Sequence, residues 1–171
     1  MYQDDLSILL RVLVACLLAG VLGWERESAG KAAGLRTHIL VGVASVLFTV
    51  VGEFMAVSFR SYGDHVRFDA ANLVGAIVTG ISFLGAGMII FRKEQHDVKG
   101  LTTAAGIVTT AAIGILVGLE RYFLAGGSTA IVFFVLRFVN IFEVKFLDPA
   151  DKPEAHKVNE ENDPAGRNGI A

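Results

Sequence analysis

The chain has 171 residues, of which 53% are hydrophobic and only 19% charged, and its mean hydropathy is +0.57. The formal net charge is −2. A water-soluble domain of this size cannot cover its surface with so few charged groups. The composition therefore excludes an ordinary soluble domain and indicates a protein embedded in a lipid bilayer.

Five apolar stretches are long enough to cross a membrane, because a helix needs about 20 apolar residues to span the hydrocarbon core. We therefore predict an all-α, polytopic membrane protein built as a five-helix transmembrane bundle. The expected spans are residues 6–24, 35–59, 70–91, 101–119 and 122–142.

Lys and Arg residues orient the bundle, because basic loops accumulate on the cytoplasmic side of a membrane. Three basic residues fall on one side of the predicted bundle, at Arg60, Arg67 and Arg121. We therefore expect the N-terminus outside and the C-terminus inside. The ten basic residues on the opposite, cytoplasmic side are Arg26, Lys31, Arg36, Arg92, Lys93, Lys99, Lys145, Lys152, Lys157 and Arg167.

The chain divides into a five-span membrane domain at residues 1–146 and a polar cytoplasmic segment at residues 147–171. The second segment contains all three prolines and has almost no apolar periodicity. Such a segment cannot bury enough apolar surface to offset the entropy of ordering it. We expect a disordered tail.

An internal repeat becomes visible when the chain is shifted by 66 residues. Each copy contains an inward span, a cytoplasmic loop and an outward span, so the repeat is parallel, with its axis along the membrane normal. The matching pairs are Leu18 and Leu84, Arg26 and Arg92, Gly34-Leu35 and Gly100-Leu101, and Thr37 and Thr103.

Small residues four positions apart indicate where helices approach closely in lipid, where packing drives association. The pairs are Ala19/Gly23, Ala76/Gly80 and Gly114/Gly118. They predict packing within one chain or between two copies of a homo-oligomer, with a dimer as the expected state.

Two opposite charges, Arg11 and Glu53, lie at equal depth below the outer boundary of the first and second spans. At 1.5 Å per residue both are about 7 to 9 Å from that boundary. Charge at this depth is costly and tends to be paired or functional. We therefore predict that Arg11 and Glu53 form an intramembrane ion pair; the alternative, of about equal weight, is that each side chain extends separately towards the outer surface of the membrane.

The densest group of polar residues lies at the cytoplasmic ends of the spans. Two helix N-termini face the cytoplasm there, and free backbone N–H groups beside basic side chains attract anions. The structural alternative is favoured: Thr102 or Thr103 caps its own helix, and Glu25 or Glu27 neutralises Arg36 or a helix end. The candidate ligand- or partner-binding residues are Glu25, Arg26, Glu27, Lys31, Arg36, Thr37, His38, Lys99, Thr102 and Thr103.

The sequence gives little support for a metal site or an enzyme active site. Glu25 and Glu27 could offer oxygen ligands to Mg²⁺, but the basic residues beside them oppose a cation. The four histidines have no ligand spacing, so we predict no metal site. No nucleophile and base stand together, and we expect no enzymatic activity, no cofactor and no nucleic-acid partner.

Several of these motifs together resemble the MgtC/SapB family of bacterial inner-membrane proteins. They are Glu25-Arg26-Glu27, Gly30-Lys31, AGLRTH at 33–38, GISFLGAGMII at 80–90 and KGLTTAAGIVTTAAIG at 99–114. The resemblance covers residues 6–119 by motif order and spacing. The motif residues carried over to this chain are Glu25, Arg26, Glu27, Arg36, Thr37, His38, Leu101, Thr102 and Thr103.

The resemblance implies a multi-pass protein of the bacterial cytoplasmic membrane linked to growth under magnesium limitation. It also implies a regulatory role through a membrane-complex partner such as the proton-translocating ATP synthase. Longer members carry a folded cytoplasmic domain after the last span, and only a short polar segment follows here, so functions that need that domain are not expected.

The sequence leaves two hypotheses about function. The leading one is a regulator whose cytoplasmic-face motif engages a membrane partner or an anionic ligand. The rival is a transporter or channel for Mg²⁺ or another small ion or solute, in which Thr79, Ser82, Thr109 and Thr110 line a narrow route. A transport pathway usually needs several polar groups at mid-membrane, and the charges here lie near the ends.

Overall fold

The computed structural model describes residues 5–60, 68–90 and 100–139. These residues form α1 (Asp5–Ser28), α2 (Leu35–Arg60), α3 (Ala70–Ile90), α4 (Leu101–Gly118), α5 (Tyr122–Phe134) and a short π-helix, η2 (Val135–Val139), that continues α5. The all-helical bundle expected from the sequence is confirmed. The polar segment at 147–171 lies outside the described residues.

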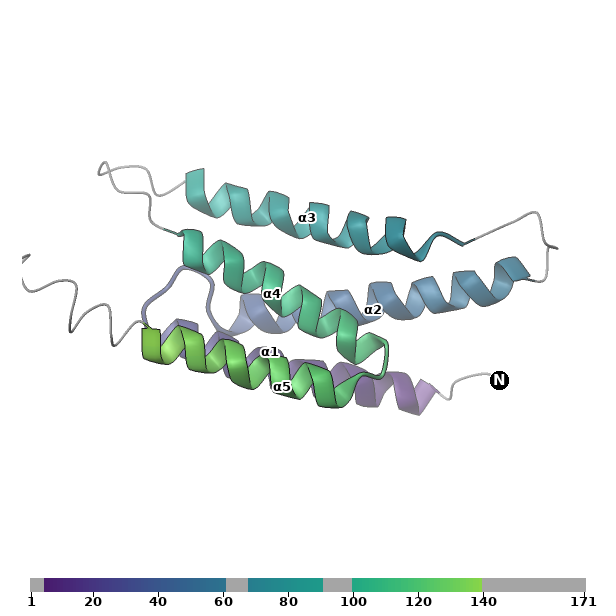
Figure 1. The fold of residues 1–171 in the computed structure, drawn as a ribbon, viewed down its shortest axis with the longest axis horizontal. Coiled ribbons are helices and arrows are strands. Elements are labelled where there is room, and N and C mark those ends of the chain that lie inside the picture. The colour runs from purple at the N-terminus through teal and green to yellow at the C-terminus, as the bar shows by residue number, and fades with distance from the viewer. Residues whose placement is uncertain (1–4, 61–67, 91–99, 140–171) are drawn as a thin grey trace, which may run out of the picture.

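Four of the helices, α1 to α4, are long and apolar enough to cross a membrane. The fifth apolar helix, Tyr122–Phe138, is shorter, and it runs beside α1 in Figure 1. The helix ends lie close to the expected positions, except that α1 continues to Ser28 instead of ending near Trp24. The Glu25-Arg26-Glu27 motif is therefore helical.

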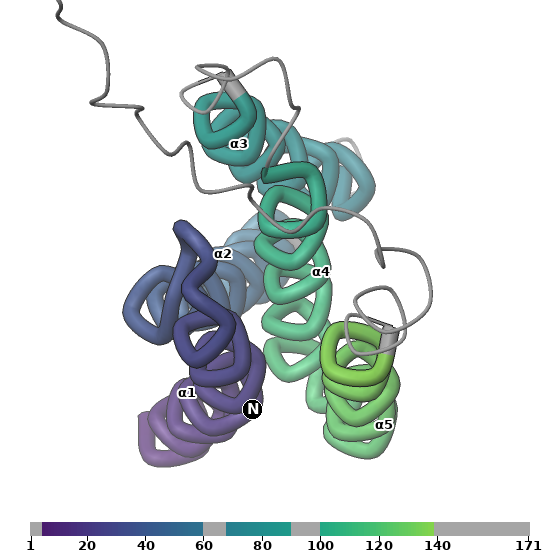
Figure 2. The backbone as a smooth tube through the Cα atoms, turned by 90° about the vertical axis from the view of Figure 1, so that its left-hand side faces the viewer, coloured from purple at the N-terminus to yellow at the C-terminus, as the bar shows by residue number. Residues whose placement is uncertain are grey.

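The five helices are arranged in alternating directions (Figure 1). The C-terminal ends of α1, α3 and α5 share one end of the bundle with the N-terminal ends of α2 and α4. We call this the inner end, following the predicted orientation, and the opposite end the outer end. Figure 2 shows α2 and α4 side by side in the middle, with α1 and α3 on opposite sides of this pair.

Local sequence signals explain how the helices begin and end. Gly30 has a φ of 65°, and the Lys31 N–H donates to the Arg26 carbonyl at 3.0 Å. This is a glycine-based C-terminal motif, in which the left-handed residue closes the helix. At α3, the Asp69 carboxylate accepts the Asn72 N–H at 3.0 Å, as an N-cap does.

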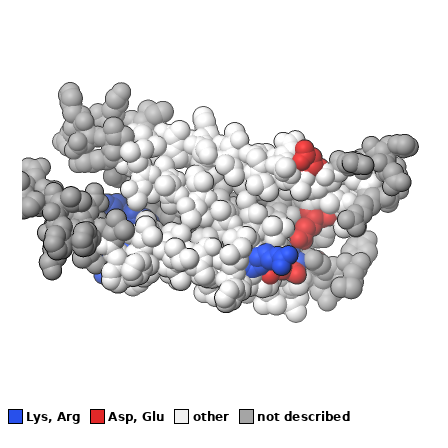
Figure 3. Space-filling view, viewed as in Figure 1, with Lys and Arg blue, Asp and Glu red and all other residues white. Residues whose placement is uncertain are grey.

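The outer surface of the bundle is apolar along its length. Large side chains such as Leu17, Leu40 and Phe83 are exposed, as expected for helices that face lipid. Figure 3 shows the same on one face, where charged side chains appear only near the two ends of the bundle. Several polar residues, among them Ser45 and Thr110, lie in the interior.

Candidate functional site

Buried polar side chains concentrate where α1, α2 and α4 meet. Arg11, His38, Ser45 and Thr110 each have a relative exposure of 0%. Polar groups inside a membrane bundle are costly unless they are hydrogen-bonded, and they mark functional positions by default. They form three connected features: a cluster at each end, and a seam between α2 and α4 that joins them.

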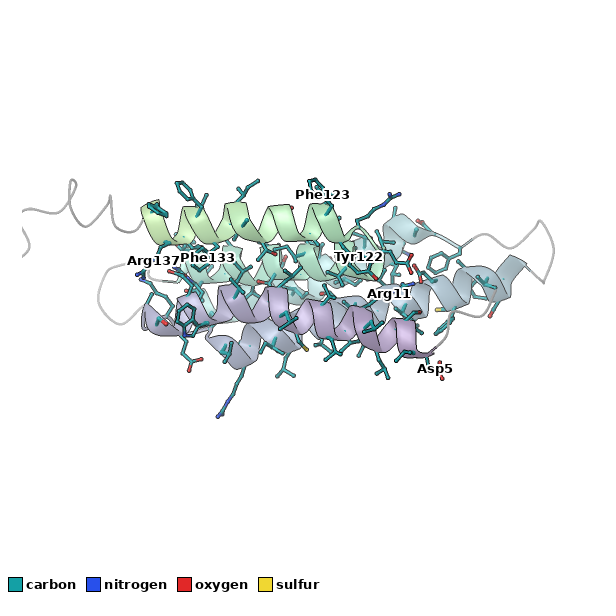
Figure 4. The ribbon with its side chains drawn as sticks, turned by 90° about the horizontal axis from the view of Figure 1, so that it is seen from below. Asp5, Arg11, Tyr122, Phe123, Phe133 and Arg137 are labelled. Carbon is teal, nitrogen blue, oxygen red and sulfur yellow. The ribbon has the colours of Figure 1, made fainter. Side chains whose placement is uncertain are left out.

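The outer cluster consists of Arg11 of α1, Glu53 of α2 and Glu120 of the α4–α5 turn. Arg11 Nη1 donates to Glu53 Oε2 at 3.0 Å and to the Gly118 carbonyl oxygen at 2.6 Å, and Nη2 donates to Glu120 Oε1. The structure thus brings together the two charges that the sequence placed at equal depth. Figure 4 shows Arg11 near the end of the bundle where α5 begins.

Glu120 is a partner of Arg11 that the sequence analysis missed. It has a φ of 60°, a left-handed conformation that is uncommon for a residue other than glycine. Its backbone N–H donates to the Val117 carbonyl at 3.0 Å as α4 ends. Its position two residues beyond α4, at the depth of Arg11, was the available signal.

The inner cluster consists of Glu25 and Arg26 of α1, His38 of α2 and Thr103 of α4. All four are buried. Arg26 Nε donates to Glu25 Oε2 at 2.5 Å, and Arg26 Nη2 donates to the Leu136 carbonyl at 3.5 Å. Arg26 therefore joins the inner end of α1 to the π-helical continuation of α5.

His38 lies between two helices at glycine positions. A Cβ added at Gly23 of α1 would lie 2.9 Å from His38 Cβ, and a Cβ added at Gly106 of α4 would lie 3.7 Å from His38 Nε2. The Gly34 carbonyl is 2.9 Å from Nδ1 and can only accept, so Nδ1 is the donor. Nε2 is buried and has no hydrogen-bond partner among the described residues.

The α2–α4 seam is a series of side chains that each lie against a glycine of the other helix. Added Cβ atoms at Gly114 and Gly118 would lie 2.8 Å from Ser45 Cβ and 2.7 Å from Thr49 Cβ. The hydroxyls donate to carbonyls of their own helix, Ser45 to Val41 at 2.9 Å and Thr49 to Ser45 at 2.8 Å. The seam comprises His38, Gly42, Ser45 and Thr49 of α2 with Gly106, Thr110, Gly114 and Gly118 of α4.

Glu27 has a different role from Glu25, the other acidic residue of the motif. Its Oε2 accepts the backbone N–H of Leu35 at 2.8 Å, so it caps the first turn of α2 from the end of α1. A Cβ at Gly34 would lie 2.8 Å from the same oxygen. The predicted acidic partner for a helix end is therefore Glu27.

The expected threonine cap of α4 is wrong. Gly100 is the N-cap residue, with a φ of 104° and no side-chain hydrogen bond to the helix end. Thr102 and Thr103 lie inside the first turn, where Thr102 is exposed and Thr103 is buried. A glycine is needed here because a side chain at that φ would be strained.

The remaining predicted binding residues do not enter the buried clusters. Lys31 and Arg36 are exposed, Thr37 is half-buried, and Lys99 lies outside the described residues. Of the predicted lining threonines and serine, only Thr110 lies in the seam; Thr79 and Ser82 are exposed on α3. Within residues 5–60, 68–90 and 100–139, no three His, Cys, Asp or Glu side chains are grouped to hold a metal ion.

A sequence model of the MgtC family matches residues 12–145, which is most of the chain. The chain belongs to the MgtC family. With its long apolar helices it is a multi-pass protein of the bacterial cytoplasmic membrane. No solved structure matches the chain.

Three similar proteins illustrate the spread of the family. YhiD of Escherichia coli (strain K12) is 41% identical over 116 residues, which cover 68% of this chain and 53% of that protein. Protein SapB of Bacillus subtilis is 35% identical over 135 residues, 79% of this chain and 57% of SapB. Protein MgtC of Brucella abortus (strain 2308) is 40% identical over 104 residues, 61% of this chain and 39% of MgtC. The chain thus spans less than two thirds of each relative.

Proposed function

We propose that this protein is a non-enzymatic membrane regulator in the adaptation of bacteria to low magnesium. Family membership supports the link to magnesium, as does the relative YhiD, which its name provisionally assigns to magnesium transport. The protein acts through its inner face on a membrane complex or an anionic ligand, and it works as a homodimer.

The observation that carries this proposal is the direct contact between helices at the centre of the bundle. An added Cβ at Gly114 would lie 2.6 Å from the Gly42 carbonyl oxygen, so the two backbones touch at mid-membrane. Ser45, Thr49 and Thr110 all donate to carbonyls within their own helices. This packing favours a closed bundle over a conduit.

The inner face offers the surface for a partner. Glu25 is paired with Arg26, and Glu27 is bonded to the first turn of α2. Lys31 and Arg36 remain exposed. Among the described residues of the inner end, the exposed Lys31 and Arg36 add two positive charges beside the exposed Glu27 carboxylate, and such cationic side chains suit an acidic protein surface or an anion.

Replacement of an exposed inner residue tests this role without disturbing the fold. On this proposal a membrane complex co-purifies with the wild type, and the wild type rescues a deletion strain in low-magnesium medium; Arg36→Ala should abolish both. Arg121→Ala, which removes an exposed arginine at the outer end, is the control and should retain both. Full rescue and unchanged co-purification with Arg36→Ala would contradict the proposal.

The second candidate is a transporter for Mg²⁺ or another small ion. It is favoured by the continuity of the buried polar residues from Arg26 and His38 through Ser45 and Thr110 to Arg11. On this alternative, Thr110→Val should reduce uptake while leaving the fold intact.

A further inference from the structure

An open apolar groove runs between α2 and α3. Its volume is about 560 Å³, and its lining includes Val41, Ala44 and Phe48 of α2 with Ala76, Gly80 and Leu84 of α3. α3 is the least buried of the long helices, and on its other side it packs against α4. Among the described residues, one side of α3 therefore has no helix packed along it.

The internal repeat shows what kind of element fits the groove. α1 packs on α2, α3 packs on α4, and α2 packs on α4, so an approximate two-fold axis between α2 and α4 exchanges the two halves (Figure 2). α5 packs against α1 and α4. Rotation about the same axis exchanges α1 with α3 and α4 with α2. The position equivalent to that of α5 therefore lies between α3 and α2, where the groove is. In the part of the chain that the structure describes, one half of the bundle thus has an additional helix, α5, and the groove is the corresponding position in the other half.

Small residues in the groove favour close approach of a helix. Of the three predicted small-residue pairs, two are used inside the chain: Gly23 lies against α2, and both Gly114 and Gly118 lie against α2. The third pair, Ala76 and Gly80, lines the groove, and a Cβ at Gly80 would meet nothing within 4 Å. In lipid such positions serve helix association by close packing.

We propose that the groove is filled by α3 of a second copy of this chain, so that two copies form a two-fold dimer about an axis along the membrane normal. Two copies in the same membrane orientation have parallel α3 helices. The incoming α3 then runs in the direction of α5, parallel to α3 and antiparallel to α2, as the two-fold position requires.

Geometry favours α3 over α5 as the incoming helix. α5 lies on the far side of the molecule from the groove (Figure 2), so inserting α5 of one copy into the groove of another would build an open chain of subunits. An α3 contact is self-complementary, because each α3 fills the groove beside the other, and it closes as a dimer. This proposal rests on the homodimer of the proposed function and assigns its interface.

Cysteine cross-linking in native membranes tests the interface. The chain has one cysteine, Cys16, so Cys16→Ser provides a cysteine-free background. On this background Ala76→Cys and Gly80→Cys should give disulfide-linked dimers on mild oxidation, because Cα atoms across a close helix contact lie within the reach of a disulfide, about 4.4 to 6.8 Å. Ser82→Cys, which places the thiol on the opposite side of α3 at similar depth, should stay monomeric on denaturing gels.

A second variant distinguishes a helix from lipid chains in the groove. Gly80→Leu fills the groove and should convert the dimer to a monomer in detergent, measured by light scattering, whereas Gly127→Leu on the exposed side of α5 should leave it dimeric. Dimers that persist in Gly80→Leu, or equal cross-linking through Ser82→Cys, would overturn the α3 interface. Rescue in low magnesium is measured separately, so a wrong interface can be told from a wrong function.

Discussion

Arg11 is a buried charge that several hydrogen bonds and ion pairs stabilise inside the bundle. Its guanidinium is fully buried, yet it binds two carboxylates and the last carbonyl of α4. The side chains of Glu53 and Glu120 are about one-third and one-half exposed, so the cluster is partly open at the outer end of the bundle. The ion pairs and the bond to Gly118 together tie α1, α2 and the end of α4 at one point.

A double-mutant cycle should detect the coupling between Arg11 and Glu53. Removing one partner of a buried pair costs about 3 to 5 kcal/mol; because Glu53 is partly exposed and Arg11 keeps Glu120, we expect about 1 to 3 kcal/mol for Glu53→Ala. Coupling with Arg11→Ala should exceed about 0.5 kcal/mol. The measurement is equilibrium unfolding in detergent micelles, with Arg121→Ala as the uncoupled control; additive effects of Arg11→Ala and Glu53→Ala would remove the pair from the account.

The cap that Glu27 provides for α2 gives a second test at this scale. Glu27→Ala should lower the free energy of unfolding by about 0.5 to 2 kcal/mol, the usual cost of losing an N-terminal cap. Glu27→Gln keeps an oxygen acceptor for the Leu35 N–H and should retain most of the stability. Equal loss in both variants, measured by the same unfolding experiment, would mean that charge and not the hydrogen bond is what matters.

Glycines determine how the helices approach one another. Gly114 brings α4 into contact with the backbone of α2 at Gly42, and Gly23 of α1 and Gly42 of α2 let those two helices approach closely. The polar seam residues lie opposite these glycines, so close packing and satisfied hydroxyls occur together. Side chains of alanine size or larger at the glycine positions would separate the helices.

Gly114→Ala should therefore lower the free energy of unfolding by about 1 to 3 kcal/mol, as in other overpacked cores. Its methyl group would lie 2.6 Å from a backbone oxygen, which cannot move aside like a flexible side chain. Gly127→Ala on α5 meets nothing within 4 Å and should be neutral or slightly stabilising. Melting temperatures in detergent would test this, and similar values for the two variants would contradict the close contact.

At the scale of the whole molecule, much of the fold could be predicted from the sequence because the apolar stretches are long and separated by polar loops. The equal depth of Arg11 and Glu53 was also readable from residue counting. The internal repeat could be recognised from Gly34-Leu35 and Gly100-Leu101. That the repeat places α2 and α4 side by side at the centre of the bundle could be seen only in the structure.

What the sequence could not supply was the direction in which each polar side chain points. Glu25 and Glu27 are two residues apart, yet one is buried with Arg26 and the other caps α2. His38 was grouped with Arg36 as a surface residue but lies in the core. The spacing of His38, Gly42, Ser45 and Thr49, by four, three and four residues, fits one helix face and was the signal that could have placed it.

We propose a bundle that is closed at its centre and that acts by regulation and not by conduction. The most direct test is the uptake of Mg²⁺ into sealed proteoliposomes containing the purified full chain, followed with a trapped magnesium-sensitive dye and compared with liposomes containing Thr110→Val or no protein. We predict that wild-type protein adds no uptake above protein-free liposomes. Saturable uptake by the wild type that Thr110→Val abolishes would contradict a closed bundle and establish a transporter.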